Sequence, residues 1–310
     1  MPVARRSRFH GILGGKAHRS GRMAPIHQAS GDNRGMNTST HPIITFIGGG
    51  NMASAIIGGL VRQGHPVSAI QVVEPWDEQR TRLAQQFAGM TVLEAASAAL
   101  RPSDLVVWAV KPQTFKEAAA AAKAFVGDAL HLSVAAGITS ESIATWLGTQ
   151  RIVRAMPNTP ALVGLGMTGL MARAAVSDAD RALVERVVRT TGELVWVNVE
   201  SDLDAVTALS GSGPAYVFYF LEAMRDAGAR MGLASEVAQQ LAIGTFLGAA
   251  TLAQRSADPL QTLRERVTSK GGTTYAAITS MESAGVKAKF EDALFAAQKR
   301  AEELGREFGK

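Results

Sequence analysis

The sequence contains no cysteine among its 310 residues. This absence excludes a disulfide framework, cysteine nucleophiles and thiolate metal sites, and it suits a reducing compartment. No run reaches the ~18 apolar residues of a membrane span, and no H-E-x-x-H, C-x-x-C or G-x-S-x-G motif occurs. Only 19% of residues are charged and 46% are hydrophobic, which is typical of a globular protein. We therefore expect a cytoplasmic globular protein with neither a metal site nor a membrane partner.

The net charge of +5 comes from the N-terminus. Residues 1–41 hold seven of the 32 Lys and Arg residues but only one of the 27 acidic residues, Asp32. The basic pI therefore says little about the folded part, and we expect no nucleic-acid partner. The segment is rich in Gly, Ser, Arg and His without periodicity. It resembles a transit peptide only in composition. We expect residues 1–41 to be a disordered extension or a mis-annotated start, with Met36 as an alternative first residue.

From Ile43 onward, short apolar segments alternate with helical patterns, which predicts a parallel sheet with helices on both faces. No convincing strand pattern follows Asp202, and the remaining segments are helical to about residue 309. We predict an α/β chain with a doubly wound sheet domain at 42–201 and an all-helical domain at 202–310. The segments that predict strands are IITFIG, AIQVVEP, SDLVVWAVKP, ALHLSVAAG, the start of RIVRAMPNTP, GMTGLMA and ELVWVN.

A glycine-rich turn joins the first strand to the first helix in the order G-x-G-x-x-A. Gly48 permits the tight turn, Gly50 lets a pyrophosphate approach the backbone, and Ala53 keeps the helix close to the strand. The amides at the helix start would hold the phosphates. The flanking strand and helix predict a Rossmann-like nucleotide site rather than a structural turn. Its candidate residues are Ile47, Gly48, Gly49, Gly50, Asn51, Met52 and Ala53.

Glu74 ends the second strand, where an acid usually accepts a hydrogen bond from the ribose 2′-hydroxyl and repels a 2′-phosphate. This position favours NADH. Alternatively, Glu74 pairs with Arg80 or Arg82, and those arginines could equally bind a 2′-phosphate of NADPH. The sequence leaves the choice between NADH and NADPH open.

Two further turns follow the carboxyl ends of predicted strands, where ligands bind in open parallel sheets. They are expected to contact the nicotinamide half of the cofactor. Lys111 is the only charged residue among them, and it is either a chemical participant or a solvated loop residue. The candidate residues are Ala109, Val110, Lys111 and Pro112 in one turn, and Ala135, Ala136 and Gly137 in the other.

Four stretches together resemble the pyrroline-5-carboxylate reductase family: FIGGGNMASAIIGGL, RAMPNTPALVGLGMT, LSGSGPAYVFYFLEAM and SKGGTTYAAI. The resemblance covers about residues 43–305. It implies a Rossmann-like domain followed by a helical domain that interlocks with a second copy, so that a homodimer forms and dimers can assemble further. It also implies hydride transfer from NADPH or NADH to the C=N bond of Δ1-pyrroline-5-carboxylate, giving L-proline. The apolar helix in PAYVFYFLEAM is then buried twice, within its own domain and against the partner.

The resemblance also implies a substrate site at Ser269, Gly271, Gly272, Thr273 and Thr274. The amides of this loop would hold the substrate carboxylate, and the Thr274 hydroxyl would lie near the imine nitrogen as the catalytic group. The alternative is an ordinary glycine-rich start of a helix. Many relatives have proline where this chain has Lys270, which leaves the loop less constrained and adds a positive charge.

Other residues have open interpretations. Asn158 and Thr159 either frame the nicotinamide pocket or hold a turn, and no histidine has a partner pattern that predicts a role. A β-hydroxyacid dehydrogenase shares the glycine-rich turn. Resemblance to that family would also require a lysine as proton carrier in a later helix, and the corresponding helix, in SGSGPAYVFYFLEAMRDAG, contains none. A non-catalytic NAD(P)-binding regulatory protein is the third interpretation, and it has no need of a substrate loop.

Overall fold

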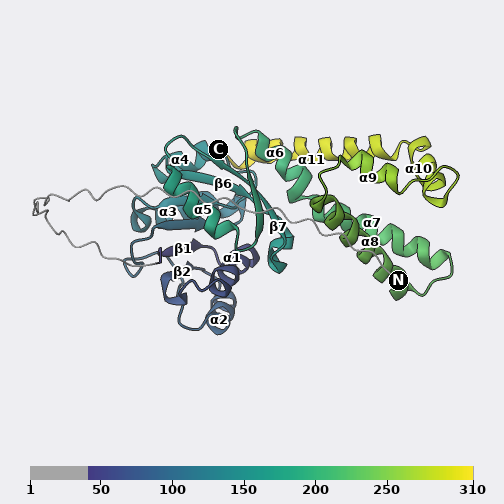
Figure 1. Cartoon of the computed structure of the whole chain (residues 1–310). Helices are drawn as coiled ribbons and strands as arrows, with labels where there is room; N and C mark the ends of the chain where they lie inside the picture. Colours follow the sequence, from purple (N-terminus) through teal and green to yellow (C-terminus); the bar gives the residue numbers. More distant parts are fainter. Residues whose placement is uncertain (1–40, 310) are drawn as a thin grey trace, which may run out of the picture. The chain divides into compact units, whose positions relative to one another are not determined.

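The computed structural model describes residues 41–309, and the expectation for the N-terminal extension lies outside them except at residue 41 (Figure 1). One eight-stranded sheet has the order β3-β2-β1-β4-β5-β6-β7-β8. The order reverses between β1 and β4, so the carboxyl ends of these two strands flank a crevice for a ligand. The strands are β1 (Ile44–Ile47), β2 (Ile70–Val73), β3 (Thr91–Leu93), β4 (Leu105–Trp108), β5 (Leu130–Ser133), β6 (Ile152–Met156), β7 (Gly166–Ala172) and β8 (Gly192–Trp196).

Helices cover both faces of this sheet. Two apolar clusters form, one between the sheet and α1, α2 and α5, the other between the sheet and α3 and α4. All four residues of β1, β2, β4 and β5 are buried, including the polar side chains of β1, β2 and β5, as in strands covered on both faces. The Rossmann-like fold is therefore confirmed. The helices are α1 (Asn51–Arg62), α2 (Asp77–Gln86), α3 (Phe115–Val126), α4 (Ser140–Leu147) and α5 (Asp178–Val188), with short 3-10 turns at η1 (Val67–Ala69), η2 (Pro112–Thr114) and η3 (Thr159–Val163).

Two features of the sheet differ from the prediction. The edge strand β3 was not predicted, because its three half-buried residues are too few to show a pattern. β7 runs antiparallel to β6, whereas the prediction was a parallel sheet. The connection between them spans only 157–165 and contains no crossover helix, and a parallel return needs a dozen or more residues.

No strand follows Trp196 within the described residues, in agreement with the predicted helical region. Its buried apolar residues are few and mostly small: Leu203, Ala208, Ala238, Ala242 and Ala301. The region therefore has little core of its own. Its elements are α6 (Asp202–Val206), a π-helical turn η4 (Thr207–Gly211), α7 (Gly213–Arg230), α8 (Ser235–Arg255), α9 (Leu260–Arg266), α10 (Thr273–Ser283) and α11 (Val286–Phe308).

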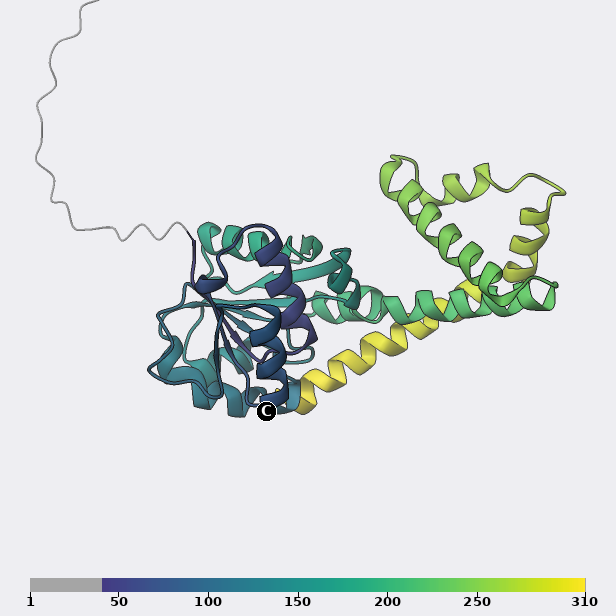
Figure 2. The same ribbon diagram turned by 90° about the horizontal axis from the view of Figure 1, so that it is seen from below.

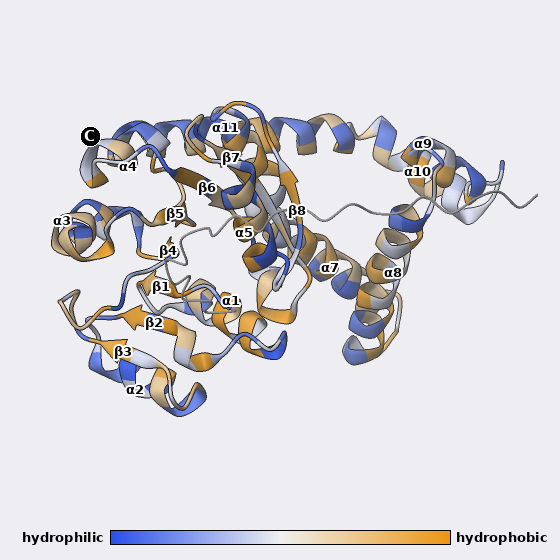
Figure 3. Ribbon diagram, turned by 60° about the vertical axis from the view of Figure 1, so that its left-hand side comes forward, coloured by the Kyte–Doolittle hydropathy of each residue, from blue (hydrophilic) through white to orange (hydrophobic). Residues whose placement is uncertain are grey.

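The expectation that α7 is buried within its own domain is wrong for the single chain. Gly228 is its only buried residue, although α7 lies against α8. Phe218 and Tyr219 are 59% and 71% exposed. Hydrophobic segments are visible along α7 and α8 in Figure 3. An apolar helix is buried only if a second surface exists to cover it, and one chain does not supply that surface.

His131 lies in β5 and is 1% exposed. The indole N–H of Trp108 donates to its Nδ1 at 3.0 Å, which requires this nitrogen to be unprotonated. Burial, together with the charge of Arg151, lowers the pKa of His131 to about 4. The histidine is therefore a neutral core residue, held by a hydrogen bond that its protonation would remove.

We predict that this buried imidazole makes the fold sensitive to mild acid. The folded state keeps His131 neutral down to about pH 4, whereas the unfolded chain binds a proton below its ordinary pKa of about 6.5. The free energy of unfolding should therefore fall by up to about 3 kcal/mol between pH 6.5 and 4. In His131→Gln, which keeps an acceptor for Trp108, this contribution should be missing. Urea unfolding at several pH values between 6.5 and 4 measures this free energy. An equal decrease in the wild-type and variant proteins would contradict the assignment.

Candidate active site

The turn between β1 and α1 uses two glycines for different reasons. Gly48 has φ +94°, and a Cβ there would lie 2.6 Å from the Ala109 carbonyl oxygen. A Cβ at Gly50 would meet nothing within 4 Å. Gly48 is thus required by the close approach of the next strand, while Gly50 leaves open space in front of the α1 N-terminus. This space and the first-turn amides fit a nucleotide pyrophosphate.

Glu74 is buried and connects the glycine-rich turn to the end of β2. Its Oε2 accepts from the Gly49 amide at 2.8 Å, and its Oε1 accepts from the Trp76 amide at 3.0 Å. A carboxylate offers about four acceptor positions, so two backbone bonds leave capacity for ribose hydroxyls. Glu74 therefore stands beside the turn in a fixed orientation that suits a ribose ligand.

The two neighbouring arginines do not pair with the Glu74 carboxylate in the described contacts. Arg80 donates to the carbonyl oxygens of Glu74 and Pro75, and it forms an ion pair with Asp77 at 3.0 Å. Arg82 pairs with Glu78 on its own helix. The alternative in which Glu74 forms a salt bridge with these arginines is therefore wrong, and both guanidinium groups already have partners on or next to α2.

The turns after β4 and β5 lie at the same edge of the sheet as Gly48. The Ala109 amide donates to the Ile47 carbonyl at 2.8 Å, and the Val134 amide donates to the Trp108 carbonyl at 3.0 Å. The turn 109–112 thus follows β4, which is next to β1, and the turn 135–137 follows β5, which is next to β4. Lys111 is exposed and directly precedes η2, and its carbonyl oxygen accepts from the Thr114 hydroxyl at 3.1 Å.

The candidate substrate loop closes on itself before α10. Gly271 has φ +77°, the Gly272 amide donates to the Ser269 carbonyl at 3.0 Å, and a Cβ at Gly272 would lie 2.7 Å from the Ser269 hydroxyl. Gly272 precedes the helix and supplies no side-chain cap. Thr273 and Thr274 are exposed. An uncapped helix start presents N–H groups to water or to an anion such as a carboxylate.

The structure does not bring the substrate loop and the nucleotide turn together within one chain. None of the contacts described for residues 269–274 reaches the β1–α1 turn, and Gly272 and Thr268 bond only within their own segment. Figures 1 and 2 show α9 and α10 separated from β1 and β2 in both views. A reaction that uses both the substrate loop and the nucleotide turn therefore needs residues from two chains, or a different conformation of a single chain.

Asn158 holds the turn that follows β6. Its Nδ2 donates to the carbonyl and the hydroxyl of Ser210, each at 3.3 Å, and its Oδ1 accepts from the Met167 amide at 2.9 Å. Both the nitrogen and the oxygen of the side-chain amide therefore form hydrogen bonds. These contacts support the interpretation that Asn158 holds the turn. Thr159 begins η3 beside it.

An apolar groove of about 830 Å³ lies beside this turn, and the sequence analysis did not predict it. The ring of Phe290 meets those of Tyr216 and Phe220 at centroid distances of 5.7 and 5.5 Å. The Tyr216 hydroxyl is buried without a hydrogen-bond partner in the described residues. The aromatic residues of PAYVFYFLEAM are the signal that could have indicated the groove. Its lining includes Asn158, Met167, Tyr216, Phe220, Phe246 and Phe290.

Within residues 41–309, no group of three or more His, Asp or Glu side chains is placed to hold a metal ion. None of the helices described is both long enough and apolar enough to cross a membrane.

Comparison with known families and proteins gives a consistent result. Residues 200–304 match the family described as pyrroline-5-carboxylate reductase dimerisation, and residues 43–137 match the family described as NADP oxidoreductase, coenzyme F420-dependent. The chain is 45% identical to a pyrroline-5-carboxylate reductase of Pseudomonas aeruginosa over 271 residues, covering 87% of this chain and 99% of the relative. It is 38% identical to that of Pisum sativum, covering 84% and 94%.

Solved structures agree. A pyrroline-5-carboxylate reductase from Coxiella burnetii is 39% identical with a TM-score of 0.80, covering 85% of this chain and 98% of that one. The Plasmodium falciparum enzyme, solved with NADP bound, is 27% identical with a TM-score of 0.76, covering 87% and 100%. With matches over nearly the full length of these relatives, the chain belongs to the pyrroline-5-carboxylate reductase family.

Proposed function

We propose that the chain reduces Δ1-pyrroline-5-carboxylate to L-proline with NADH or NADPH, the last step of proline biosynthesis. The observation that carries the proposal is that a chain of this family has two helix starts that suit anions. One is the open space at Gly50 before α1, and the other is the uncapped start of α10 behind Gly271 and Gly272. The first suits a pyrophosphate and the second a substrate carboxylate.

A protonated cyclic imine is already an electrophile, so orientation counts for more than a strong acid or a metal. When bound, a reduced nicotinamide would supply the hydride for the C=N carbon, and the ring nitrogen would keep its proton and gain an electron pair. The amides of Thr273 and Thr274 bind the carboxylate, with Ser269 and the glycines shaping the loop. The Thr274 hydroxyl hydrogen-bonds the ring nitrogen. The charge of Lys270, next to this loop, adds attraction for the anionic substrate.

On the nucleotide side, the amides at 48–53 hold the pyrophosphate and Glu74 accepts from the ribose hydroxyls. The turns 109–112 and 135–137 border the nicotinamide. The NADP bound in the Plasmodium falciparum relative supports NADPH as a cofactor of the family. The buried Glu74 carboxylate favours NADH here, because it would repel a 2′-phosphate.

We propose a division at the start of α6, with 42–201 binding the nucleotide and 202–310 serving dimerisation and substrate binding. The exposed apolar residues of α7 and α8 support a homodimer, which could assemble further into a higher oligomer of dimers. Because loop 269–274 makes no described contact with the β1–α1 turn of its own chain, we propose that each active site combines one protomer's turn with its partner's loop. We place the enzyme in the cytoplasm.

The direct test is imine-dependent oxidation of NADH or NADPH by the purified protein. The proposal expects turnover with Δ1-pyrroline-5-carboxylate and formation of proline. Cofactor binding without turnover would indicate a regulatory protein. Oxidation of a β-hydroxyacid would indicate the dehydrogenase alternative, although α7 contains no lysine for that chemistry.

We predict that Glu74→Ser shifts cofactor preference toward NADPH. Removing the carboxylate removes its repulsion of a 2′-phosphate, so the ratio of kcat/KM for NADPH to that for NADH should rise about tenfold. Glu78→Gln is the matched control, because it removes an exposed negative charge from the same region while leaving Glu74 in place. Steady-state kinetics with both cofactors measure the ratio, and an equal change in the two variants would sink the ribose assignment.

We predict that the Thr274 hydroxyl acts on the reacting nitrogen and not on the carboxylate. Losing a hydrogen bond that involves charge costs about 1.5–3 kcal/mol, so Thr274→Val should lower kcat/KM roughly 10- to 100-fold. The backbone amides stay in place, so the dissociation constant for proline should change little.

Thr273→Val is the control variant, since its hydroxyl has no assigned role. Steady-state kinetics and calorimetric titration with proline separate the two effects. Full activity of Thr274→Val would mean that the hydroxyl has no chemical role.

A further inference from the structure

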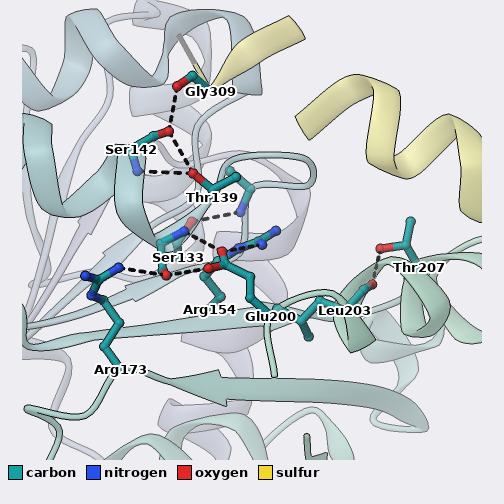
Figure 4. Close-up of polar contacts among 11 residues, drawn as sticks. Ser133, Thr139, Ser142, Arg154, Arg173, Glu200, Leu203, Thr207 and Gly309 are labelled. Carbon is teal, nitrogen blue, oxygen red and sulfur yellow. Dashed lines mark hydrogen bonds and ion pairs between the residues drawn. The ribbon is translucent and has the colours of Figure 1, made fainter. Parts of the chain in front are cut away.

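Both ends of the helical region attach to the same short stretch of the nucleotide domain. Glu200, just before α6, bonds to the first turn of α4, and Gly309, just after α11, bonds to the same turn (Figure 4). That turn follows directly on residues 135–137. The nicotinamide turn is thus flanked by the entry and the exit of the helical region.

The entry contact is a network around the Glu200 carboxylate. It accepts from the Ser140 amide, from the Ser140 hydroxyl at 2.6 Å and from the Arg154 guanidinium at 2.8 Å. Arg173 donates to the same Ser140 hydroxyl at 3.1 Å. Burial opposes the charge of Glu200, but the bonds from Ser140 and Arg154 outweigh it and lower its pKa. An ionised carboxylate held by three donors fixes this junction firmly.

The exit contact involves the last turn of α11. The Ser142 hydroxyl donates to the Gly309 carbonyl at 2.7 Å. A Cβ at Gly137, which has φ +73°, would lie 3.2 Å from the Leu304 Cβ. Phe308 packs against the apolar cluster that contains Ala135 and Ile138. The end of α11 therefore contacts the region of the turn 135–137 in three ways. Leu304 lies close to the Gly137 backbone, the Phe308 ring packs on the neighbouring apolar cluster, and the Gly309 carbonyl accepts a hydrogen bond from Ser142.

The contacts of Phe308 and Gly309 lie beyond the family match, which ends at residue 304, and Leu304 is the last residue that the match covers. The segment 305–309 therefore needs its own explanation. Leu304 lies so close to Gly137, whose backbone is in the left-handed region, that a small shift of either residue would change the shape of the turn 135–137. A helix end that only terminated α11 would not require so close an approach.

We propose that the last turn of α11, through Leu304, Phe308 and the Gly309 carbonyl, is a positioning element that sets the nicotinamide turn 135–137. The inference rests on the proposed function, since it assumes that this turn borders the nicotinamide. These residues act through the turn and touch neither cofactor nor substrate. A change at this site should therefore weaken binding of the nicotinamide half and leave the adenosine half unaffected.

The test compares two ligands in the full-length protein. NADH contains the nicotinamide, whereas ADP-ribose lacks it, so the ratio of their dissociation constants reports on the turn 135–137. Phe308→Ala should weaken NADH binding about tenfold and Ser142→Ala about threefold, with ADP-ribose binding unchanged in both. Phe308→Leu should largely restore NADH binding. Phe125→Ala, an exposed phenylalanine near the end of α3, is the matched control and should change neither constant.

Calorimetric titration gives both constants without turnover. If NADH and ADP-ribose weaken equally, or if neither changes in Phe308→Ala and Ser142→Ala, α11 does not position the turn and the proposal is overturned. Ser142→Ala keeps the test valid if Phe308→Ala does not fold. A wild-type protein that binds neither ligand would contradict the proposed function itself, and the proposal with it.

Discussion

The helical region leaves many more large apolar side chains exposed than it buries, and the proposed assembly depends on their being covered. Phe218, Tyr219, Leu241 and Leu247 are each more than half exposed, while the buried apolar residues after Leu203 are all alanines. Burying such side chains contributes about 1.5–3 kcal/mol each, so a second copy of the chain would gain stability by covering α7 and α8. The proposed homodimer is therefore supported by this imbalance as well as by the match to a family described as a dimerisation domain.

The nucleotide domain, in contrast, completes its own site. Glu74 connects the Gly49 amide to the Trp76 amide, Gly48 lies against Ala109, and Gly50 faces open space. These contacts involve only the sheet and its turns. The helical region adds the two attachments at Ser140 and Ser142. The proposed cofactor site thus lies within one protomer, and the proposed substrate loop makes no described contact with its β1–α1 turn.

Much of this could be predicted from the sequence, because local patterns carry it. Four-residue apolar strands, the glycine-rich turn and the switch to helices after Asp202 were all predicted and appear in the structure. The antiparallel β7 could also have been predicted from the short connection before it. Burial of α7 within its own domain was predicted wrongly, since hydropathy reports a need for cover and not whether the same chain supplies it.

Long-range contacts could not be predicted. The Asn158 side chain bonds Ser210, and Ser142 bonds Gly309, across separations of 52 and 167 residues. No spacing rule relates such positions, so they depend on how the domains pack. The acid at Glu74 was predicted, but its bond from the Gly49 amide, 25 residues away, and hence its fixed orientation were not.

The most direct test of the shared active site is a mixed dimer of two inactivated chains. Gly50→Val adds a side chain where a Cβ would meet no atom within 4 Å, in the open space before α1, and Thr274→Val removes the hydroxyl proposed to bond the imine nitrogen. If turn and loop come from different protomers, one site of the heterodimer carries both changes and the other carries none. The co-purified heterodimer should then recover about half of the wild-type activity. A heterodimer no more active than the two variant homodimers would contradict the account.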